Sequence, residues 1–127
     1  MRIAKVLKIG ILILLVVALA GYAWPGLVIS EGVASYYSYE CARLPMANGK
    51  PFDPENRTCA SWFYDFGTVL IVKSLDTGLS TEVVVTDRGP NKRLVREGRI
   101  IDLSKRAFQD ICRLEKGLTR VAIIVKE

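Results

Sequence analysis

Two hydrophobic patterns divide the chain. Residues 9–23 run without a charged side chain, directly behind a short basic segment. From residue 30 onward, apolar positions come instead in short β-prone runs separated by turn residues, which is typical of a small β protein. The pattern predicts a hydrophobic helix within residues 1–29 and a single mainly β domain over residues 30–127.

The N-terminal pattern matches a secretory signal, which has a basic segment followed by an apolar run. Gly21 and Ala23 fit the −3 and −1 positions of a cleavage site. Leu27–Ile29 extend the run towards the roughly 20 apolar residues that a spanning helix needs, so cleavage and membrane anchoring both stay open. The positive-inside rule keeps the basic end in the cytoplasm. We therefore expect an exported domain, either periplasmic or extracellular, or anchored in a membrane and facing outward.

Two β-branched runs lie in the middle of the domain. Residues 67–74 and 81–86 flank Leu75-Asp76-Thr77-Gly78, which predicts a β-hairpin. Both runs are almost continuously apolar, and this favours burial on both faces, as in a small closed barrel.

The last third of the chain adds two strands and a helix to the prediction. Residues 99–103 read as a strand, and Ser104 is a suitable N-cap for a helix that continues to about Leu114. Residues 118–125 alternate in hydrophobicity and predict a final strand. Residues 42–58 are rich in Pro, Gly and Asn and predict an ordered loop.

Net charge limits the class of partner. The chain carries a net charge of +5. Arg2, Lys5 and Lys8 supply three of these charges, which leaves a net charge of +2 for the domain. So weak a positive charge argues against nucleic acid as the main partner. Separately, we expect the protein to be a monomer.

Cysteine and histidine usage restricts the chemistry. Three cysteines allow at most one intramolecular disulfide, and Cys41–Cys59 is favoured over the pairings with Cys112 because both lie in the irregular first half. Such a bridge could stabilise the fold by roughly 3 kcal/mol. The chain has no histidine, which excludes Ser-His-Asp triads and Cys-His dyads. No metal or organic cofactor site is predicted.

Two aspartates are candidates for chemistry. Asp87 stands where an apolar strand meets the Gly89-Pro90 turn, so it could act as a general acid at a groove, or cap the turn through backbone N–H groups. Asp53 lies in the polar loop before Pro54, where it could accept hydrogen bonds from sugar hydroxyls or form an Asx turn.

Asp102 and the aromatic residues have simpler interpretations. Asp102 precedes the Ser104 cap, and we assign both a structural role at the helix N-terminus. Aromatic rings stack on sugars but more often pack in cores; Phe66 is expected in the core, with Trp62 and Tyr64 exposed. The aromatic set is Tyr36, Tyr37, Tyr39, Trp62, Phe63, Tyr64 and Phe66.

In their shared order and spacing, the motifs from residue 31 onward resemble the rare lipoprotein A (RlpA-like) family. The segments that carry the resemblance are Gly32-Val33-Ala34-Ser35-Tyr36-Tyr37, Met46-Ala47-Asn48-Gly49 with Phe52-Asp53, Thr58-Cys59-Ala60-Ser61, Phe66-Gly67-Thr68, Asp87-Arg88-Gly89-Pro90 and Arg99-Ile100-Ile101-Asp102-Leu103-Ser104. The resemblance implies a six-stranded double-psi β-barrel, shared with expansins, with a short helix near its C-terminus.

The resemblance also implies an activity. Active members of the family are lytic transglycosylases that cleave peptide-poor peptidoglycan strands with a single acid/base, which matches Asp87 here. Asp53 matches a second acidic position in the groove. Lys50, Ser61, Tyr37, Trp62 and Arg88 are the further candidate substrate-binding residues.

The chain departs from the family pattern at two of these positions. Lys50 stands where active members usually have Glu, and Ser61 where they usually have His. A lysine there is expected to pair with Asp53 or Asp87 and to lower the pKa of that carboxyl group. The alternative functions are a non-catalytic, expansin-like module that binds or loosens the wall glycan, and a scaffold that recruits another wall protein.

Overall fold

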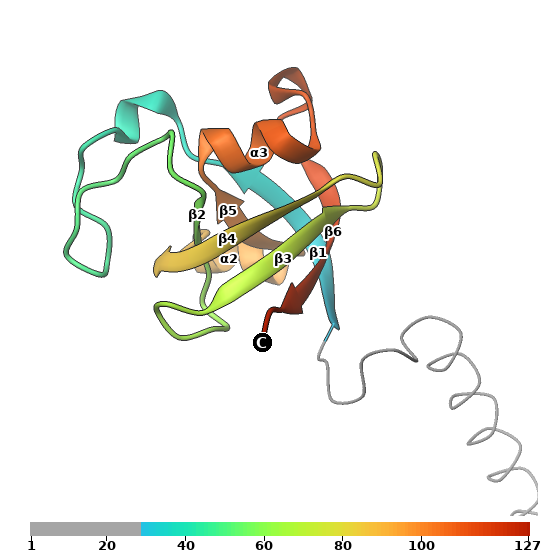
Figure 1. The fold of residues 1–127 in the computed structure, drawn as a ribbon, viewed down its shortest axis with the longest axis horizontal. Coiled ribbons are helices and arrows are strands. Elements are labelled where there is room, and N and C mark those ends of the chain that lie inside the picture. Colours follow the sequence, from blue (N-terminus) through green and yellow to red (C-terminus); the bar gives the residue numbers. More distant parts are fainter. Residues whose placement is uncertain (1–28) are drawn as a thin grey trace, which may run out of the picture.

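The computed structural model describes residues 29–127 of the chain (Figure 1). Its strands are Ile29–Tyr36 (β1), Thr58–Ala60 (β2), Val69–Ser74 (β3), Ser80–Asp87 (β4), Arg99–Leu103 (β5) and Thr119–Val125 (β6). Its helices are Lys92–Arg96 (α2) and Lys105–Ile111 (α3), with 3-10 turns at Tyr39–Cys41 (η1) and Leu114–Lys116 (η2). Ile29, which we had assigned to the export segment, begins β1, and the rest of that predicted segment lies outside the described residues.

The strands close into a barrel in the order β1-β5-β2-β4-β3-β6. The β1–β5 and β2–β4 pairs are parallel, and the other neighbours are antiparallel. The predicted hairpin is confirmed as β3 and β4, which pair in the register Val69↔Val84 to Lys73↔Ser80. The predicted closed barrel of six strands is confirmed.

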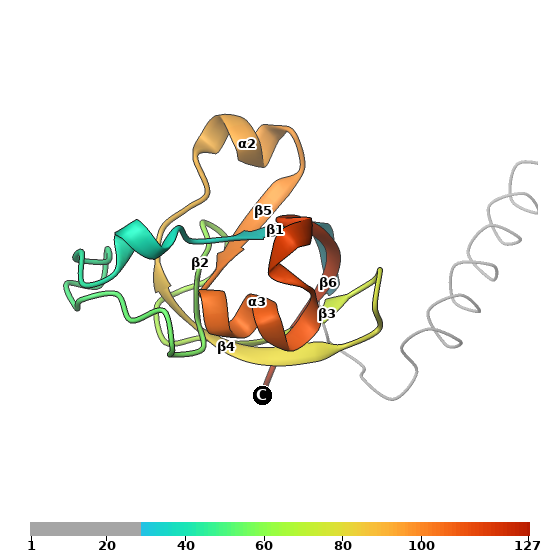
Figure 2. The ribbon, with the colours of Figure 1, turned by 90° about the horizontal axis from the view of Figure 1, so that it is seen from above.

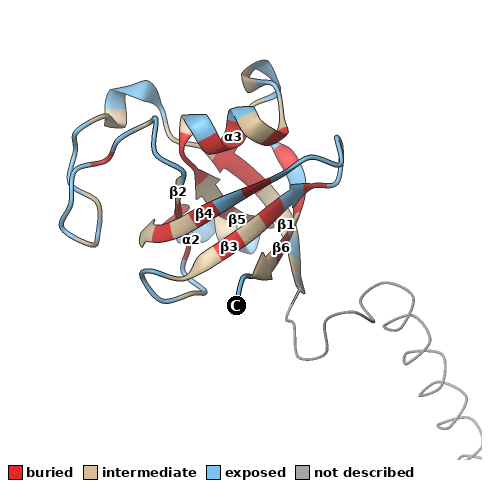
Figure 3. Cartoon of the chain, in the orientation of Figure 1, coloured by how far each residue is buried: buried red, intermediate tan, exposed pale blue. Residues whose placement is uncertain are grey.

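The barrel buries one face of its strands rather than both. Along β3, Leu70 and Val72 are fully buried, while Val69 and Ile71 keep intermediate exposure (Figure 3). Alternate side chains of a strand point to opposite faces, so only every second one reaches the interior. The prediction of burial on both faces was therefore wrong.

Helix α3 covers one end of the barrel. Seen from above, it lies across the opening that the strands surround (Figure 2). Ala107, Phe108 and Ile111 bury their side chains among the inward residues of the strands. Ser104 caps the helix as predicted, since its Oγ accepts the N–H of Ala107 at 3.2 Å.

Helix α3 ends earlier than predicted. Its last residue is Ile111, and Cys112 is already extended. The hydroxyl of Thr77 binds the carbonyl oxygen of Ile111 at 2.6 Å. This bond satisfies one of the carbonyl groups that a helix C-terminus leaves free. The predicted helix therefore stops at Ile111, and Leu114 already begins the separate turn η2.

The aromatic prediction was partly wrong. Trp62 is exposed, as expected, but Phe66 is 43% exposed rather than in the core. Arg88 explains its place, because the guanidinium carbon lies 4.1 Å from the centre of the Phe66 ring, outside the barrel. Tyr64 is only half-buried and shares a hydrogen bond of 2.9 Å with Ser30.

The favoured Cys41–Cys59 disulfide is not formed, because all three cysteines are free thiols. Cys59 lies on β2 and is 3% exposed in the barrel core, and burial raises the pKa of its thiol to about 12. Cys41 belongs to η1, a turn without buried residues. The two side chains therefore occupy separate environments.

Candidate active site

Asp87 is the last residue of β4 and lies at the edge of the barrel. Its Oδ1 accepts hydrogen bonds of 2.8 Å from the backbone N–H groups of Ala47 and Arg88. Its Oδ2 accepts a hydrogen bond from the hydroxyl of Tyr37. Asp87 thus binds backbone N–H groups at the turn, as considered above, and its carboxylate is fixed at the end of a strand.

Tyr37 orients this carboxylate. Its ring packs against Phe52 with centroids 4.7 Å apart. Burial, and then the hydrogen bond to Asp87, raise the pKa of the Tyr37 hydroxyl above its ordinary value. The hydroxyl therefore stays protonated and remains a hydrogen-bond donor to Asp87.

A second carboxylate lies across β2 from the first. On β2, Ala60 pairs with Asp87 on one side and with Asp102 of β5 on the other. Gly89 lies in the turn between them: a Cβ atom at Gly89 would lie 3.6 Å from Oδ2 of Asp102. The strand register thus places Asp87 and Asp102 on the two sides of Ala60.

Asp102 has different partners from those predicted. It does not cap α3; its Oδ1 accepts a hydrogen bond from Ser35 and pairs with the guanidinium of Arg99 at 3.5 Å. Sequence reasoning missed Ser35 and Arg99 as neighbours of the site. The available signal was a charged residue inside the short apolar strand Arg99–Leu103, where a carboxylate needs partners.

Asp53 and Lys50 lie in the loop between η1 and β2. Asp53 is exposed, and its Oδ1 accepts the N–H of Glu55 at 2.9 Å, which is the Asx turn considered above. Lys50 is exposed and makes no ion pair within residues 29–127. The expected pairing of Lys50 with Asp53 or Asp87 is therefore wrong.

A cavity of about 380 Å³ opens beside Asp53. Phe52 lines it and also packs against Tyr37, so the cavity adjoins the residues that hold Asp87. The volume lies within the range of ligand pockets, roughly 300–1,000 Å³. The lining residues are Tyr39, Ala42, Arg43, Pro51, Phe52, Asp53, Pro54 and Glu55.

Ser61 and Arg88 shape the loop that follows β2. Ser61 is 1% exposed, and its Oγ accepts the N–H of Phe63 at 3.1 Å. Arg88 donates from Nη1 to the carbonyl oxygens of Ser61 and Tyr64, both at 2.7 Å. These contacts hold the loop against the Asp87 turn, and substrate contact by Ser61 or Arg88 stays a prediction.

Trp62 forms a fixed aromatic surface beside the same turn. Its Nε1 donates to the carbonyl oxygen of Pro90 at 2.6 Å, and 41% of the residue is exposed. The ammonium of Lys92 lies 4.8 Å from the ring centre. An exposed indole held in one orientation suits stacking on a sugar ring.

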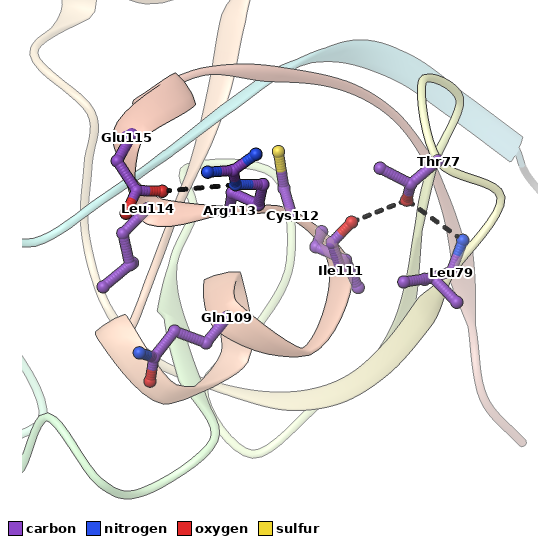
Figure 4. A pocket seen from close by; sticks show the side chains of 8 residues that line it. All are labelled: Thr77, Leu79, Gln109, Ile111, Cys112, Arg113, Leu114 and Glu115. Carbon is purple, nitrogen blue, oxygen red and sulfur yellow. Dashed lines mark hydrogen bonds and ion pairs between the residues drawn. The ribbon is translucent and has the colours of Figure 1, made fainter.

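A second cavity lies elsewhere (Figure 4). It measures about 440 Å³ and is formed by the β3–β4 turn, the end of α3 and η2, with Thr77 bridging Ile111 and Leu79. It adjoins the start of β4, whereas Asp87 ends that strand. Seven residues of strand separate the two places by about 23 Å, so this cavity is not part of the site.

Two further observations concern the described part of the chain. Within residues 29–127, no group of three or more His, Cys, Asp or Glu side chains is arranged to hold a metal ion. In the same range, neither helix has the length and hydropathy that a membrane crossing requires.

Comparison with known proteins places this chain in a family. Residues 29–123 match the family model described as lytic transglycolase. The probable endolytic peptidoglycan transglycosylase RlpA of Treponema pallidum is 38% identical over 96 residues, covering 76% of this chain and 29% of that protein. The endolytic peptidoglycan transglycosylase RlpA of Helicobacter pylori is 37% identical over 95 residues, with 75% and 29% coverage. The chain thus spans less than a third of these relatives.

Solved structures agree on the fold. The Streptomyces papain inhibitor superposes with a TM-score of 0.61 at 22% identity, covering 78% of this chain and 96% of that one. A mutant Clavibacter michiganensis expansin in complex with cellohexaose superposes with a TM-score of 0.58 at 19% identity, with 79% and 51% coverage. The barrel, the order of its motifs and the family match together show that this chain belongs to the RlpA-like lytic transglycosylase family of double-psi β-barrel domains.

Proposed function

We propose that this protein is an exported lytic transglycosylase that cleaves peptidoglycan glycan strands, with Asp87 as its acid/base. The observation that carries the proposal is the Asp87 carboxylate, fixed by three hydrogen bonds between the Asp53 cavity and the exposed Trp62 ring. The names of the RlpA relatives support the reaction class.

The chemistry needs one group that gives and then takes a proton. Protonated Asp87 donates to the glycosidic oxygen as the bond from that oxygen to C1 breaks. The C6 hydroxyl of the same muramic acid attacks C1, and its proton returns to Asp87. The products are a free 4-hydroxyl end and a 1,6-anhydro end, and no water is consumed. A positioned acid/base of this kind contributes about 10²–10⁴-fold in rate.

Asp53, Trp62 and Tyr37 have supporting roles in this proposal. Trp62 stacks on a sugar beside the Asp87 turn, and Asp53 binds hydroxyl groups of a sugar in the adjoining cavity. Tyr37 keeps the carboxylate of Asp87 in one orientation. Asp102, on the other side of Ala60, is the neighbouring carboxylate whose contribution has to be separated from that of Asp87.

Product release from stripped glycan tests the proposal. The full chain, purified in mild detergent, is incubated with amidase-stripped sacculi, and anhydro-ended sugars are measured by mass spectrometry. We expect Asp87→Asn to reduce their release at least 100-fold with an unchanged circular dichroism spectrum. Comparison with Asp102→Asn shows which of the two carboxylates donates the proton and takes it back. Wild-type release by Asp87→Asn would contradict the assignment.

The second candidate function is a glycan-binding or wall-loosening module without catalysis. The observation that favours it is the position of Ser61, whose hydroxyl is buried and bound to backbone, so that no side chain there faces a ligand. This function predicts that the wild-type chain sediments with stripped sacculi yet releases no anhydro-ended sugar.

A further inference from the structure

The connection between β2 and β3 exposes three aromatic rings. Residues 61–68, here called the aromatic loop, contain Trp62, Phe63 and Phe66, which are three of the eight large hydrophobic residues exposed within residues 29–127. Phe63 is 59% exposed. The function proposed above gives a role to Trp62 alone, so two exposed rings of the loop remain without one.

The aromatic loop lies at the end of the barrel where the chain enters β1. Tyr64, in the middle of the loop, shares its hydrogen bond of 2.9 Å with Ser30 of β1. The end of β6 is there too, because the N–H of Lys126 binds the carbonyl oxygen of Val69 at 2.9 Å. This end lies opposite α3 (Figure 1). The exposed rings are therefore close to the point at which the preceding residues join the barrel.

The length of the chain before β1 limits how far this end can be from a membrane. Residues 9–23 are the uncharged run of the expected export segment. Only residues 24–28 separate this run from β1, and they can bridge at most about 20 Å. If the run stays in a bilayer as an anchor, the aromatic loop is held near the bilayer surface.

Helix α2 adds cations to the same end of the barrel. The ammonium of Lys92 lies 4.8 Å from the centre of the Trp62 ring, and a carbonyl group just after the helix accepts the N–H of Val33 in β1 at 2.9 Å. Lys92, Arg93 and Arg96 are exposed and form no ion pair within residues 29–127. Aromatic rings and cations of this kind are enriched at membrane surfaces.

We propose that the aromatic loop and α2 dock together on the surface of a phospholipid bilayer. Phe63 and Phe66 enter the boundary between headgroups and acyl chains, and the cations of α2 bind lipid phosphates. Docking keeps the Asp87 site close to the membrane, where it reaches nearby polymer and not distant polymer. The inference goes beyond the proposed function and does not depend on catalysis.

The mixture of side chains favours a bilayer over a soluble polyanion. Glu31, Asp65 and Glu97 are exposed acidic residues on the same segments, and they repel a polymer that carries a charge on every unit. A bilayer offers phosphate groups above an apolar layer, so it suits the rings and the cations together.

Quenching by brominated phospholipid tests whether the loop reaches the acyl chains. The full chain is reconstituted into vesicles of equal parts phosphatidylglycerol and acyl-brominated phosphatidylcholine. Trp24→Phe and Trp62→Phe remove both tryptophans of the sequence, and Phe63→Trp then supplies the reporter. The control reporter is Leu79→Trp in the same background, because Leu79 is 55% exposed and lies beyond the other end of β3. Circular dichroism confirms that both variants are folded.

We expect brominated lipid to quench the emission of Phe63→Trp and to leave that of Leu79→Trp unchanged. Adding Arg93→Gln and Arg96→Gln to the first reporter should weaken docking about 30-fold, as two cations at an anionic surface allow, with loss of the quenching. Lys73→Gln with Lys116→Gln, the same charge change at other exposed positions, should not.

Three results would overturn the inference. The first is equal quenching of the two reporters, and the second is an unquenched Phe63→Trp. The third is an unquenched Phe63→Trp whose emission shifts when glycan strands are added, since the loop would then be a sugar subsite. Release of anhydro-ended sugars tests the proposed function alone, so the two proposals can fail separately.

Discussion

At the scale of single residues, the candidate site depends on which hydrogen-bond donors the Asp87 carboxylate accepts. A carboxylate offers about four acceptor positions, and three donors are present: two backbone N–H groups at Oδ1 and the Tyr37 hydroxyl at Oδ2. The remaining position belongs to Oδ2. A proton that moves to and from a glycosidic oxygen is therefore expected at Oδ2, with Tyr37 setting the direction of that atom.

Removing this donor should slow the reaction while preserving the fold. Tyr37→Phe keeps the ring that packs against Phe52 but leaves Oδ2 without its partner. A hydrogen bond to a charged group contributes about 1.5–3 kcal/mol, so we expect roughly a 10–100-fold loss of anhydro-sugar release. Because its pKa is raised, Tyr37 should stay protonated through pH 10, and the wild-type rate should show no loss there from its ionisation.

The control for this variant is Tyr36→Phe. Tyr36 is the preceding residue, and its hydroxyl donates to the carbonyl oxygen of Leu114 at 3.0 Å, away from Asp87. We expect it to keep the wild-type rate. A Tyr37→Phe rate as high as that of the control would show that the carboxylate does not need its side-chain donor.

At the scale of elements, the sequence predicted those helices and strands whose segments are long or strongly patterned. The β3–β4 hairpin, β5, β6 and the Ser104 cap follow from apolar runs and their boundaries. It did not reveal α2, whose five residues are too few to show a helical period, although Asn91 after Pro90 is a usable N-cap signal. The three-residue strand β2 was hidden for the same reason, since only pairing with β4 and β5 defines it.

The Ser104 cap contributes stability that can be measured. Its hydroxyl is 1% exposed and satisfies an N–H at the start of α3, the helix that covers one end of the barrel. Ser104→Ala should lower the free energy of unfolding by about 1 kcal/mol and the Tm by about 4–8 °C in thermal melts. The matched control is Ser38→Ala, which removes an exposed cap from the short turn η1 and should leave the Tm nearly unchanged. Equal shifts would show that burial of the cap has no influence.

At the scale of the whole molecule, the order of the strands in the barrel creates the candidate site. This order cannot be read from any local sequence pattern. Asp87 and Asp102 flank Ala60 from its two sides because both pair with it, one in parallel and one in antiparallel register. The sequence could single out Asp87 as a candidate from its motif, but the place of Asp102 required the closed barrel. The same holds for Cys59, which lies in the barrel core as a free thiol, although its place in the irregular first half had favoured a disulfide with Cys41.

One ion pair links three separated parts of the fold and should set its acid stability. Asp110 of α3 accepts hydrogen bonds from Arg57, just before β2, at 2.5 and 3.1 Å, and from Thr81 of β4 at 2.8 Å. The bond from Arg57, followed by that from Thr81, holds the pKa of Asp110 below its ordinary value. Asp110 therefore stabilises the fold above the unfolded pKa of about 3.9, and this contribution is lost as the pH falls through the lower folded pKa.

Asp110→Asn removes that dependence. We expect the variant to be less stable than wild type at pH 7 by about 1 kcal/mol, after allowing for solvent screening of a partly exposed pair. The two stabilities should converge as the pH falls below about 4, because the wild-type carboxylate then becomes protonated. Urea denaturation midpoints at pH 7, 5, 4 and 3 measure this, with Glu115→Gln as control, since Glu115 contacts Arg113 at 3.7 Å with both side chains largely exposed. If the difference in stability between Asp110→Asn and wild type stays constant down to pH 3, the Arg57–Asp110 pair does not contribute to acid stability. Another carboxylate must then account for any acid transition. Asp76 is one such group, since hydrogen bonds, first that from the Arg120 backbone N–H, lower its pKa.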